Sequence, residues 1–526
     1  MALVPLCLAT FANAQFQTDP FQPGLRSSHA ATIADAWLPQ SVDFAAGGEL
    51  VWTAGSGTAS RLALLSSAPS GAIAPELVDS LSPAGASGTV AVAGAKRADR
   101  LFSAAQFPTI DASHKRTTIA LHDAFASAAS GTFAPRWAHD MGLFVNGPVK
   151  LACDAAGTKA VAALSDANTG TARVDWLDGS TGALLARVDF ASSPLRALAC
   201  SRDLSRTALV VGTTLFVFDA NGVKVHQESL GAATYALGLS GDSSRLIVGA
   251  QNKLRVLARA ADSSYTSLFT VTSAPSELAT RVALSDDGST WAAGWWNSLS
   301  PASIRFEVWD GPSQTRTWFA LQSGPPGGLQ NYPEAVAVTP DGRRAAFASW
   351  GVLDSQPELV LVDKALAAPV LSVDLPASAL SLALDDGGTR IAVGMKHVHA
   401  NQFGSTGEFR VYDTGERDLQ VVAAPRHGGN LQLAAHHPGS SITLFVVGPL
   451  SPTAQTFPNC TGSLWIDRKA RPLVFARPSD AAGNAVFSAP LSSSSSAIGV
   501  PFAVQAAARA GGKLHFSTSV VEPVVL

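Results

Sequence analysis

The sequence carries little charge, and neither sign predominates. Lysine and arginine together number 37 and aspartate and glutamate 40 among 526 residues, so the formal net charge at pH 7 is -3. A protein that binds nucleic acid or an acidic membrane surface by electrostatics needs a clear excess of positive charge. We therefore expect no nucleic-acid partner.

Cysteine is scarce as well, with residues at positions 7, 153, 200 and 460 only. Loss of an N-terminal segment that holds Cys7 would leave an odd number, which does not make a disulfide framework. Cys153 and Cys200 occupy equivalent places in neighbouring repeats, and we interpret them as small buried residues. Their disulfide state, like that of Cys460, stays open because spacing alone does not give the distance between them.

Long apolar runs are missing after the N-terminus, so no transmembrane segment is expected. The first residues do contain a short apolar stretch that ends in Ala12-Asn13-Ala14, a small-x-small cleavage pattern, although no positive charge precedes it. We predict that residues 1–14 are a signal peptide cleaved after Ala14. The protein would then be secreted, or would reside in the periplasm or cell envelope. The alternative is a frayed N-terminal tail.

What the sequence has in abundance is glycine (45 residues), proline (31) and short apolar segments. A pattern returns about eight times: an apolar strand, a tight Asp/Gly turn, a second apolar strand, and a third strand that ends in Asp. The clearest copy runs over residues 282–294, with Asp286-Asp287-Gly288 as its turn, and continues to Trp309-Asp310. Short strands that repeat every 40 to 50 residues or so indicate a β-propeller.

The repeats can be aligned on the turn that follows the first strand. The turn positions are Gly48, Arg97, Gly157, Leu204, Ser243, Gly288, Gly342 and Gly388. We predict an all-β fold with eight blades over residues 40–427, after a lead-in segment at 15–39. Seven blades is the alternative, because the first two repeats are the least regular.

These repeats resemble those of WD40/YVTN-type propellers, in which a strand, a Ser-Pro-Asp-Gly-like turn and a strand ending near Trp-Asp recur. The nearest match to that turn is Val-Ala-Val-Thr-Pro-Asp-Gly at residues 336–342. The resemblance extends from about residue 40 to 425. It implies a propeller fold but no particular function, since propellers serve as binding modules, scaffolds and enzymes.

The period breaks after about residue 428. Strand-like segments continue, among them residues 442–448 and 503–507, without a helical pattern. We predict a small C-terminal β-sandwich over residues 428–526. The segment Cys-x-Gly-x-Leu-x-Ile-Asp at 460–467 gives this region a resemblance to the C-terminal modules of bacterial secreted proteins, which implies export and extracellular display. The role of the module stays open.

The candidate binding residues lie in loops that would share one face of a propeller. These loops join the second strand to the third and each blade to the next, so their side chains should converge on the mouth of the central axis. Aromatic faces with polar edges suit a protein or carbohydrate ligand. The candidate ligand-binding residues are Trp137, His139, Trp295, Trp296, Tyr332, Trp350, His397 and His399. The alternative for Trp295, Trp296 and Trp350 is that they wedge between blades.

The sequence offers no framework for a metal or a cofactor. His397 and His399 are two residues apart, so on a strand both rings would face the same way, but no third ligand is apparent. Cys-x-x-Cys and His-x-x-x-His spacings are absent. We therefore predict no metal site and no cofactor.

No Gly-x-Ser-x-Gly elbow, phosphate-binding loop or dinucleotide fingerprint occurs in a plausible setting, so no catalytic residue is assigned. Taken together, these features favour a secreted, monomeric, non-enzymatic propeller that binds a protein or carbohydrate on its axial loop face. One alternative is a propeller enzyme, a lactonase-like hydrolase or a quinone-dependent dehydrogenase, with a site assembled from scattered loop residues. The other is a purely structural envelope protein. The identity of the ligand is left open.

Overall fold

The structure is a computed structural model, and it describes residues 27–521 apart from short gaps, the longest of which are 82–87, 124–133, 324–330 and 495–501. The predicted signal peptide at 1–14 lies outside the described residues. The described part of the chain is built almost wholly from β-strands. Its single helical element is the 3-10 turn η2 (Arg468–Ala470). None of the described helical segments is long and apolar enough to cross a membrane.

Within the described residues, eight four-stranded antiparallel sheets, here called blades 1 to 8, form the larger part of the structure. Blades 1 to 4, written from the inner to the outer strand, are β2 (Leu38–Ala45), β3 (Leu50–Ser56), β4 (Ser60–Ser67) and β5 (Ile73–Leu81); β6 (Gly88–Gly94), β7 (Arg100–Pro108), β8 (His114–Asp123) and β9 (Trp137–Val145); β10 (Val149–Cys153), β11 (Lys159–Ser165), β12 (Ala172–Asp178) and β13 (Leu184–Phe190); and β14 (Leu195–Cys200), β15 (Arg206–Val211), β16 (Thr214–Asp219) and β17 (Lys224–Ser229).

Blades 5 to 8 have the same strand order. They are β18 (Leu237–Leu239), β19 (Arg245–Ala250), β20 (Lys253–Arg259) and β21 (Tyr265–Thr272); β22 (Glu277–Leu284), β23 (Thr290–Asn297), β24 (Ser303–Asp310) and β25 (Thr315–Ser323); β26 (Pro333–Val338), β27 (Arg344–Ser349), β28 (Leu359–Asp363) and β29 (Leu371–Val373); and β30 (Ala379–Leu384), β31 (Arg390–Lys396), β32 (Gly407–Asp413) and β1 (Ser27–Thr32). The predicted all-β propeller class is confirmed.

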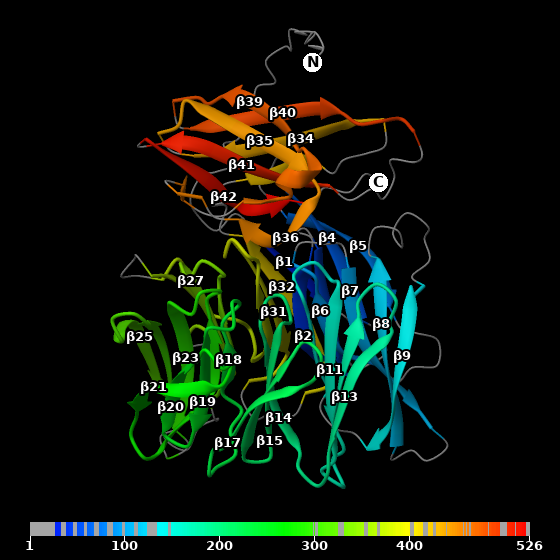
Figure 1. The fold of residues 1–526 in the computed structure, drawn as a ribbon, viewed down its shortest axis with the longest axis vertical. Coiled ribbons are helices and arrows are strands. Elements are labelled where there is room, and N and C mark those ends of the chain that lie inside the picture. The colour runs from blue at the N-terminus through cyan, green and yellow to red at the C-terminus, as the bar shows by residue number, and fades with distance from the viewer. Residues whose placement is uncertain are drawn as a thin grey trace.

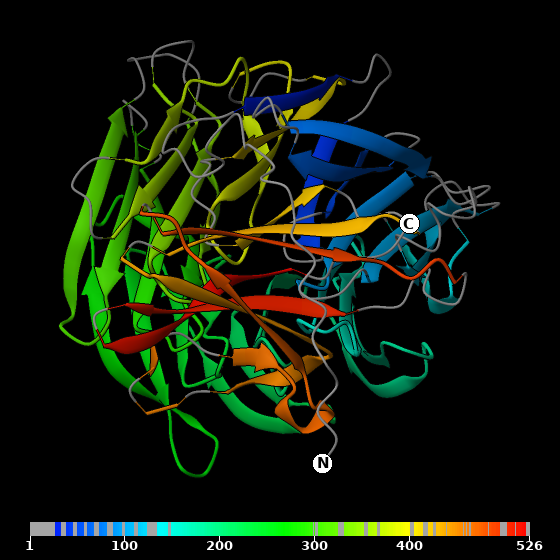
Figure 2. The ribbon, with the colours of Figure 1, turned by 90° about the horizontal axis from the view of Figure 1, so that it is seen from above.

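The sheets stand side by side in a ring around a central axis (Figure 2). The inner strand of each blade contacts the inner strand of a neighbouring blade, and β2 of blade 1 packs against β30 of blade 8, so the ring closes. Each inner strand begins at one end of the axis and ends at the other. We call the end where inner strands begin the loop face, and the end where they run into their tight turns the turn face.

The ring is closed by a strand from the beginning of the chain. β1 pairs antiparallel with β32, from Ser27 opposite Asp413 to Thr32 opposite Glu408, and so supplies the outer strand of blade 8. The predicted lead-in segment at 15–39 therefore needs correction, because part of it belongs to the propeller. Its sequence, Ser-Ser-His-Ala-Ala-Thr, lacks the repeat signature because its partner strand lies more than 370 residues further along the chain.

The strand sequences explain how the blades pack. Second strands such as β27 and β31 lie between neighbouring blades, and every residue in them is buried. A strand buried on both faces is apolar over most of its length rather than alternating, and the polar residues of β27 and β31 stand at the strand ends. Outer strands such as β13 and β17 face solvent, and their residues are either exposed or half-buried. The hydrophobic core therefore consists of a series of clusters between successive blades.

The tight turns at the ends of the inner strands use left-handed backbone. Gly288 and Gly342 adopt φ of 66° and 70°, which costs glycine nothing. Leu204 and Ser243 take the same place with φ of 52° and 60°, conformations that are unfavourable for residues with a Cβ. All four are positions on which the repeats align, so the turn chemistry alone located these blades.

After blade 8 the chain forms a separate set of sheets, here called the C-terminal β-unit. A three-stranded sheet and a five-stranded sheet contribute to one core that includes Leu433, Phe445 and Phe487. The strands are β33 (Leu419–Ala423), β34 (Asn430–His436) and β40 (Asn484–Pro490); β37 (Cys460–Thr461), β42 (Lys513–Val521), β41 (Ala503–Ala510), β35 (Ile442–Gly448) and β39 (Leu473–Pro478); and a pair, β36 (Leu450–Gln455) and β38 (Leu464–Ile466).

The C-terminal β-unit stacks on one end of the propeller (Figure 1), and its first strand, β33, contacts β4 of blade 1. β33 begins at Leu419, inside the segment 40–427 predicted for the propeller. The boundary between the two parts therefore falls at residues 414–418, before β33 rather than after it. The evidence for this boundary is the pairing of β33 with β34, which the tertiary structure shows and the local sequence does not.

Candidate functional site

Three of the predicted binding residues meet at the loop face. Trp296 lies near the end of β23, Tyr332 directly before β26 and Trp350 directly after β27. The rings of Trp296 and Tyr332 are 5.4 Å apart, edge to face, and those of Tyr332 and Trp350 are 5.2 Å apart. The three side chains are half-buried, so they form a continuous aromatic row across blades 6 and 7.

A half-buried carboxylate, Glu334, joins this row to the inner strands. The indole N–H of Trp350 donates to Glu334 Oε2 at 3.0 Å, and Arg281 Nη2 lies 3.1 Å from Glu334 Oε1. The register of β26 shifts between Pro333 and Ala335, so Glu334 sits in a bulge. Bulges re-aim side chains, which accounts for a charged residue at the start of an inner strand.

Arg281 connects the carboxylate to the aromatic row. Its guanidinium lies 5.4 Å from the centre of the Tyr332 ring and also contacts the Tyr332 hydroxyl (Nη1–Oη 3.4 Å). A third interaction joins its Nη1 to the carbonyl oxygen of Thr280 at 3.0 Å. Arg281 is thereby held in one orientation, and most of its donors are already engaged.

Two lysines add positive charge to the same place. Lys396, at the end of β31, holds its Nζ 5.5 Å from the centre of the Trp350 ring. Lys150 is the second residue of β10, on the opposite side of the axis. The charges of Arg281 and Glu334 both affect its pKa. The loop-face mouth thus gathers side chains from blades 3, 6, 7 and 8.

Burial shifts the titration of these groups toward their neutral forms. It raises the pKa of Glu334, against the stabilising effects of Arg281 and Trp350 on the carboxylate. Burial also lowers the pKa of Lys150, and the nearby Arg281 lowers it further. The pKa of Lys396 is lowered by burial too.

Trp295 has a structural place instead. Its side chain is fully buried in the cluster between blades 5 and 6, and its indole N–H donates to Glu307 Oε2 at 2.9 Å. The interpretation of Trp295 as a wedge between blades therefore fits the structure. The side chain of Trp295 points to the opposite side of the strand from that of Trp296, as the side chains of successive strand residues do.

Trp137 and His139 were expected in a loop between blades, and that placement is wrong. Both lie on β9, the outer strand of blade 2. Trp137 donates from Nε1 to the carbonyl oxygen of Gly179 at 3.0 Å, and His139 Nε2 lies 2.8 Å from Asp175 Oδ2. These contacts tie blade 2 to blade 3. The alternating pattern of β9 was not recognised because half its residues are polar or exposed.

His397 and His399 follow β31 directly and lie at the loop face. His397 Nδ1 is 3.1 Å from Thr406 Oγ1, and its Nε2 is 3.7 Å from Glu408 Oε2. His399 is buried, whereas His397 is more exposed. Among the residues that the structure describes, no group of three or more His, Cys, Asp or Glu side chains is arranged to hold a metal ion.

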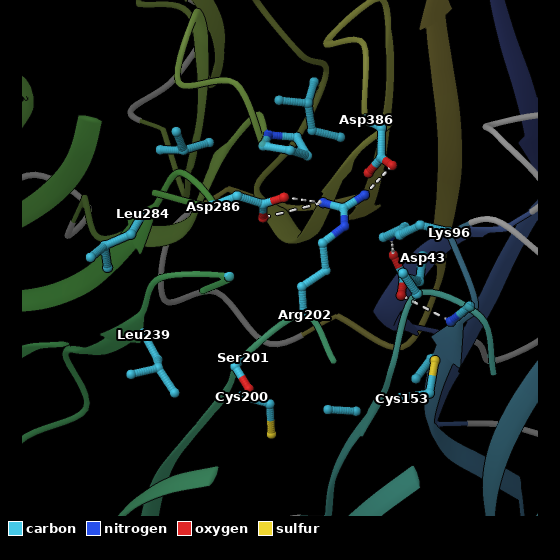
Figure 3. A pocket seen from close by; sticks show the side chains of 18 of the residues that line it. Asp43, Lys96, Cys153, Cys200, Ser201, Arg202, Leu239, Leu284, Asp286 and Asp386 are labelled. Atoms are coloured by element: carbon cyan, nitrogen blue, oxygen red, sulfur yellow. Dashed lines mark hydrogen bonds and ion pairs between the residues drawn. The ribbon is translucent and has the colours of Figure 1, made fainter. Parts of the chain in front are cut away.

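A cavity of about 340 Å³ lies at the turn face, at the other end of the axis (Figure 3). Its wall is made by the last residues of the inner strands and by the tight turns that follow them. The charged and sulfur-containing residues of the wall are Asp43, Lys96, Cys153, Cys200, Arg202, Asp286, Asp385 and Asp386.

Arg202 crosses the mouth of this cavity. It lies between Asp286 and Asp386 and forms ion pairs with both (Figure 3). Lys96 forms a second ion pair with Asp43. Arg202, Asp286 and Asp386 occupy the same position of the turn in blades 4, 6 and 8. Each is the second residue after the end of its inner strand. Sequence reasoning missed this site, although a charged residue recurring at that position was a usable signal.

Cys153 and Cys200 end β10 and β14 and face the same cavity (Figure 3). They are not joined by a disulfide, and neither is Cys460. Burial raises the pKa of Cys200 to about 12, and it raises the pKa of Cys153 well above its ordinary value. Both thiols are therefore protonated near pH 7, and a thiol is a weak nucleophile and a weak metal ligand compared with a thiolate.

The sheets, turns and central axis define a β-propeller with charged residues at both ends of its axis. No protein-family model matches the chain, and no curated protein matches its sequence. One solved structure similar to it is the crystal structure of the Saccharomyces cerevisiae Sqt1, with 10% sequence identity over 75% of this chain and 99% of that one and a TM-score of 0.49. No conclusion about function follows from so distant a similarity.

Proposed function

We propose that this propeller is a non-enzymatic binding protein that holds a protein partner at its loop face. The observation that carries the proposal is the row Trp296–Tyr332–Trp350 with Arg281 against it. Tryptophan, tyrosine and arginine are the residues that most often dominate the energy of a protein interface. Here the row is half-buried and already fixed in place, so binding would order few side chains.

Exposed apolar residues extend this surface. Tyr235, two residues before the inner strand of blade 5, is 50% exposed, and Leu299, in the connection between β23 and β24, is 62% exposed. Leu278, near the start of β22, is exposed as well. All three belong to the loop face by their positions in the strands. An apolar patch rimmed by charged residues is typical of an interaction surface.

A protein ligand suits the row better than a carbohydrate. Sugar recognition by stacking needs a free aromatic face. Arg281 lies over the Tyr332 ring and the edge of Trp296 meets it, so that ring is already occupied. We also favour binding over catalysis, because Glu334, the carboxylate at the centre of the mouth, is held by Arg281 and Trp350.

Export and a monomeric state belong to the same proposal. Export rests on the cleavage pattern Ala12-Asn13-Ala14. The monomer rests on the pairing of β1 with β32, because a strand of the same chain supplies the outer strand of blade 8. Native mass spectrometry of the protein secreted by its own host would test both. A monomer that begins at Gln15 is expected, and a retained N-terminus or a stable dimer would contradict the corresponding part.

Site-specific photo-crosslinking in the producing cells tests the binding face. A photoreactive phenylalanine analogue replaces Leu299 at the loop face or, as the matched control, Leu185, which is 48% exposed on the outer strand β13. A discrete protein adduct is expected from position 299 and not from 185, and it should disappear with Trp296→Ala. An adduct from 185 alone would contradict the proposal. Glycan-array binding that depends on Trp296 would identify a carbohydrate instead.

A further inference from the structure

A second cavity, of about 310 Å³, lies between blades 5 and 6. The turn residues 287–289 and the hairpin residues Gly311, Pro312 and Gln314 border it, so it lies toward the turn face. Sites for small molecules have volumes from about 300 Å³ upward and mostly apolar walls. The inner wall of this cavity consists of side chains from both blades: Ile247, Val256, Phe269, Leu284 and Trp291.

Trp291, in the second strand of blade 6, contributes the polar group of this inner wall. Its side chain is fully buried, and within the described part of the chain its indole N–H has no hydrogen-bond acceptor. One face of its ring is covered by Trp309, which stacks on it with the ring centres 5.0 Å apart. A buried donor without an acceptor is unfavourable, and native structures seldom contain one.

Comparable tryptophans between blades do have acceptors. Trp176 donates from Nε1 to Thr207 Oγ1 at 3.1 Å, across blades 3 and 4. Trp309, the stacking neighbour of Trp291, donates to Glu307 Oε2 at 3.1 Å. The missing acceptor at Trp291 therefore coincides with the presence of a cavity beside its ring.

The charged side chains at the edge of the cavity are engaged elsewhere. Asp287 accepts from Ser285 Oγ at 2.7 Å and from the N–H of Ser289 at 2.9 Å. Arg245 donates to the carbonyl oxygen of Ser244 at 3.1 Å. Leu268, which also lines the cavity, is exposed on the outer strand β21. The cavity thus has an apolar side chain at its solvent side and an indole donor inside.

We propose that this cavity binds a small apolar molecule with one hydrogen-bond acceptor, such as an aryl ketone or ester, whose carbonyl oxygen accepts from Trp291. The site lies away from the loop face, so the inference goes beyond the binding function proposed above. A water molecule fits less well, because a buried water makes about two to four hydrogen bonds and the inner wall offers one donor. An apolar ligand gains from the remaining wall instead.

The test uses acetophenone and α-methylstyrene with the full-length protein, because the two have nearly the same shape and only acetophenone carries a carbonyl acceptor. Saturation-transfer NMR titrations should show that both bind. In protein labelled with ¹⁵N-tryptophan, one indole N–H resonance should move downfield with acetophenone and not with α-methylstyrene.

Trp291→Phe should remove that resonance and weaken acetophenone binding at least about fivefold relative to α-methylstyrene. The comparison of two probes cancels the effect of the smaller ring, as in a double-mutant cycle. Trp318→Phe is the matched control, because Trp318 is a half-buried tryptophan packed in the cluster between blades 6 and 7. It should leave the ratio of the two affinities unchanged.

Leu268→Trp should abolish binding of both probes, because it fills the cavity from an exposed position that tolerates a larger side chain. Binding that survives Leu268→Trp would place the probes elsewhere and overturn the inference. So would an unchanged ratio in Trp291→Phe, or no binding of either probe, which would mean that the cavity holds water only. The indole shift and Leu268→Trp decide the matter even if Trp291→Phe fails to fold.

Discussion

The guanidinium of Arg202 lies 3.2 Å from the carboxylate of Asp286 (Nη1–Oδ2), although the two residues belong to blades 4 and 6. The same guanidinium also forms an ion pair with Asp386 of blade 8. One arginine therefore connects three blades across the turn face. This arrangement holds two carboxylates close together only as long as the arginine separates them.

Arg202→Ala should destabilise the propeller, because it removes the positive charge that lies between the carboxylates of Asp286 and Asp386. We expect the free energy of unfolding in urea to fall by about 1–3 kcal/mol. Adding Asp286→Asn and Asp386→Asn to Arg202→Ala should restore most of the loss. If the triple variant is no more stable than Arg202→Ala, repulsion between the carboxylates is not the cause.

Trp295→Ala and Trp296→Ala should differ sharply in stability. Trp295 is fully buried, so its removal leaves a cavity and should cost about 3–5 kcal/mol in urea unfolding. Trp296 is half-buried at the loop face, and its removal should cost about 1 kcal/mol. Similar losses for the two variants would mean that Trp296 also serves blade packing and is not kept for binding.

Glu358 should make the protein less stable as the pH rises. Burial, with a smaller effect of the nearby Asp374, raises the pKa of this carboxyl to about 8, although the N–H of Leu375 donates to Glu358 Oε2 at 2.6 Å and acts in the opposite direction. The unfolded chain releases the proton near its ordinary pKa, whereas the folded protein keeps it. Stability is therefore full below about pH 4.5 and declines as the pH rises through about 8.

Glu358→Gln tests this, because glutamine resembles the protonated acid. We expect it to raise the free energy of unfolding by about 1–4 kcal/mol at pH 8 and to change it little at pH 5. Asp189→Asn, which neutralises an exposed carboxylate, is the control for the change in net charge. Equal effects of Glu358→Gln at the two pH values would contradict the assignment of the titration to Glu358.

Removal of β1 should open the ring. A chain that begins at residue 33 lacks the outer strand of blade 8 and exposes the edge of β32, whereas a chain that begins at residue 27 keeps it. We expect the first to melt several degrees lower than the second and to aggregate more readily. Identical melting curves would show that pairing of β1 with β32 contributes nothing to closure.

The sequence by itself determined the repeating units and the propeller class. Turn aspartates, glycines at positive φ and apolar strands act over a few residues, so each unit can be recognised without its neighbours. The positions of Leu204 and Gly288 show this, since both were aligned from turn chemistry and both adopt the left-handed backbone. The row of Trp296, Tyr332 and Trp350 followed from the same local rule, because strand order assigns each loop to a face.

Only the tertiary structure decided which of these residues touch. The pairing of β1 with β32, the contact of Arg202 with Asp286 and Asp386, and the ion pair of Arg281 with Glu334 all join segments far apart in the chain. Such contacts depend on how the blades twist and close into a ring. That closure is settled by packing between whole sheets, which no local pattern in the sequence records.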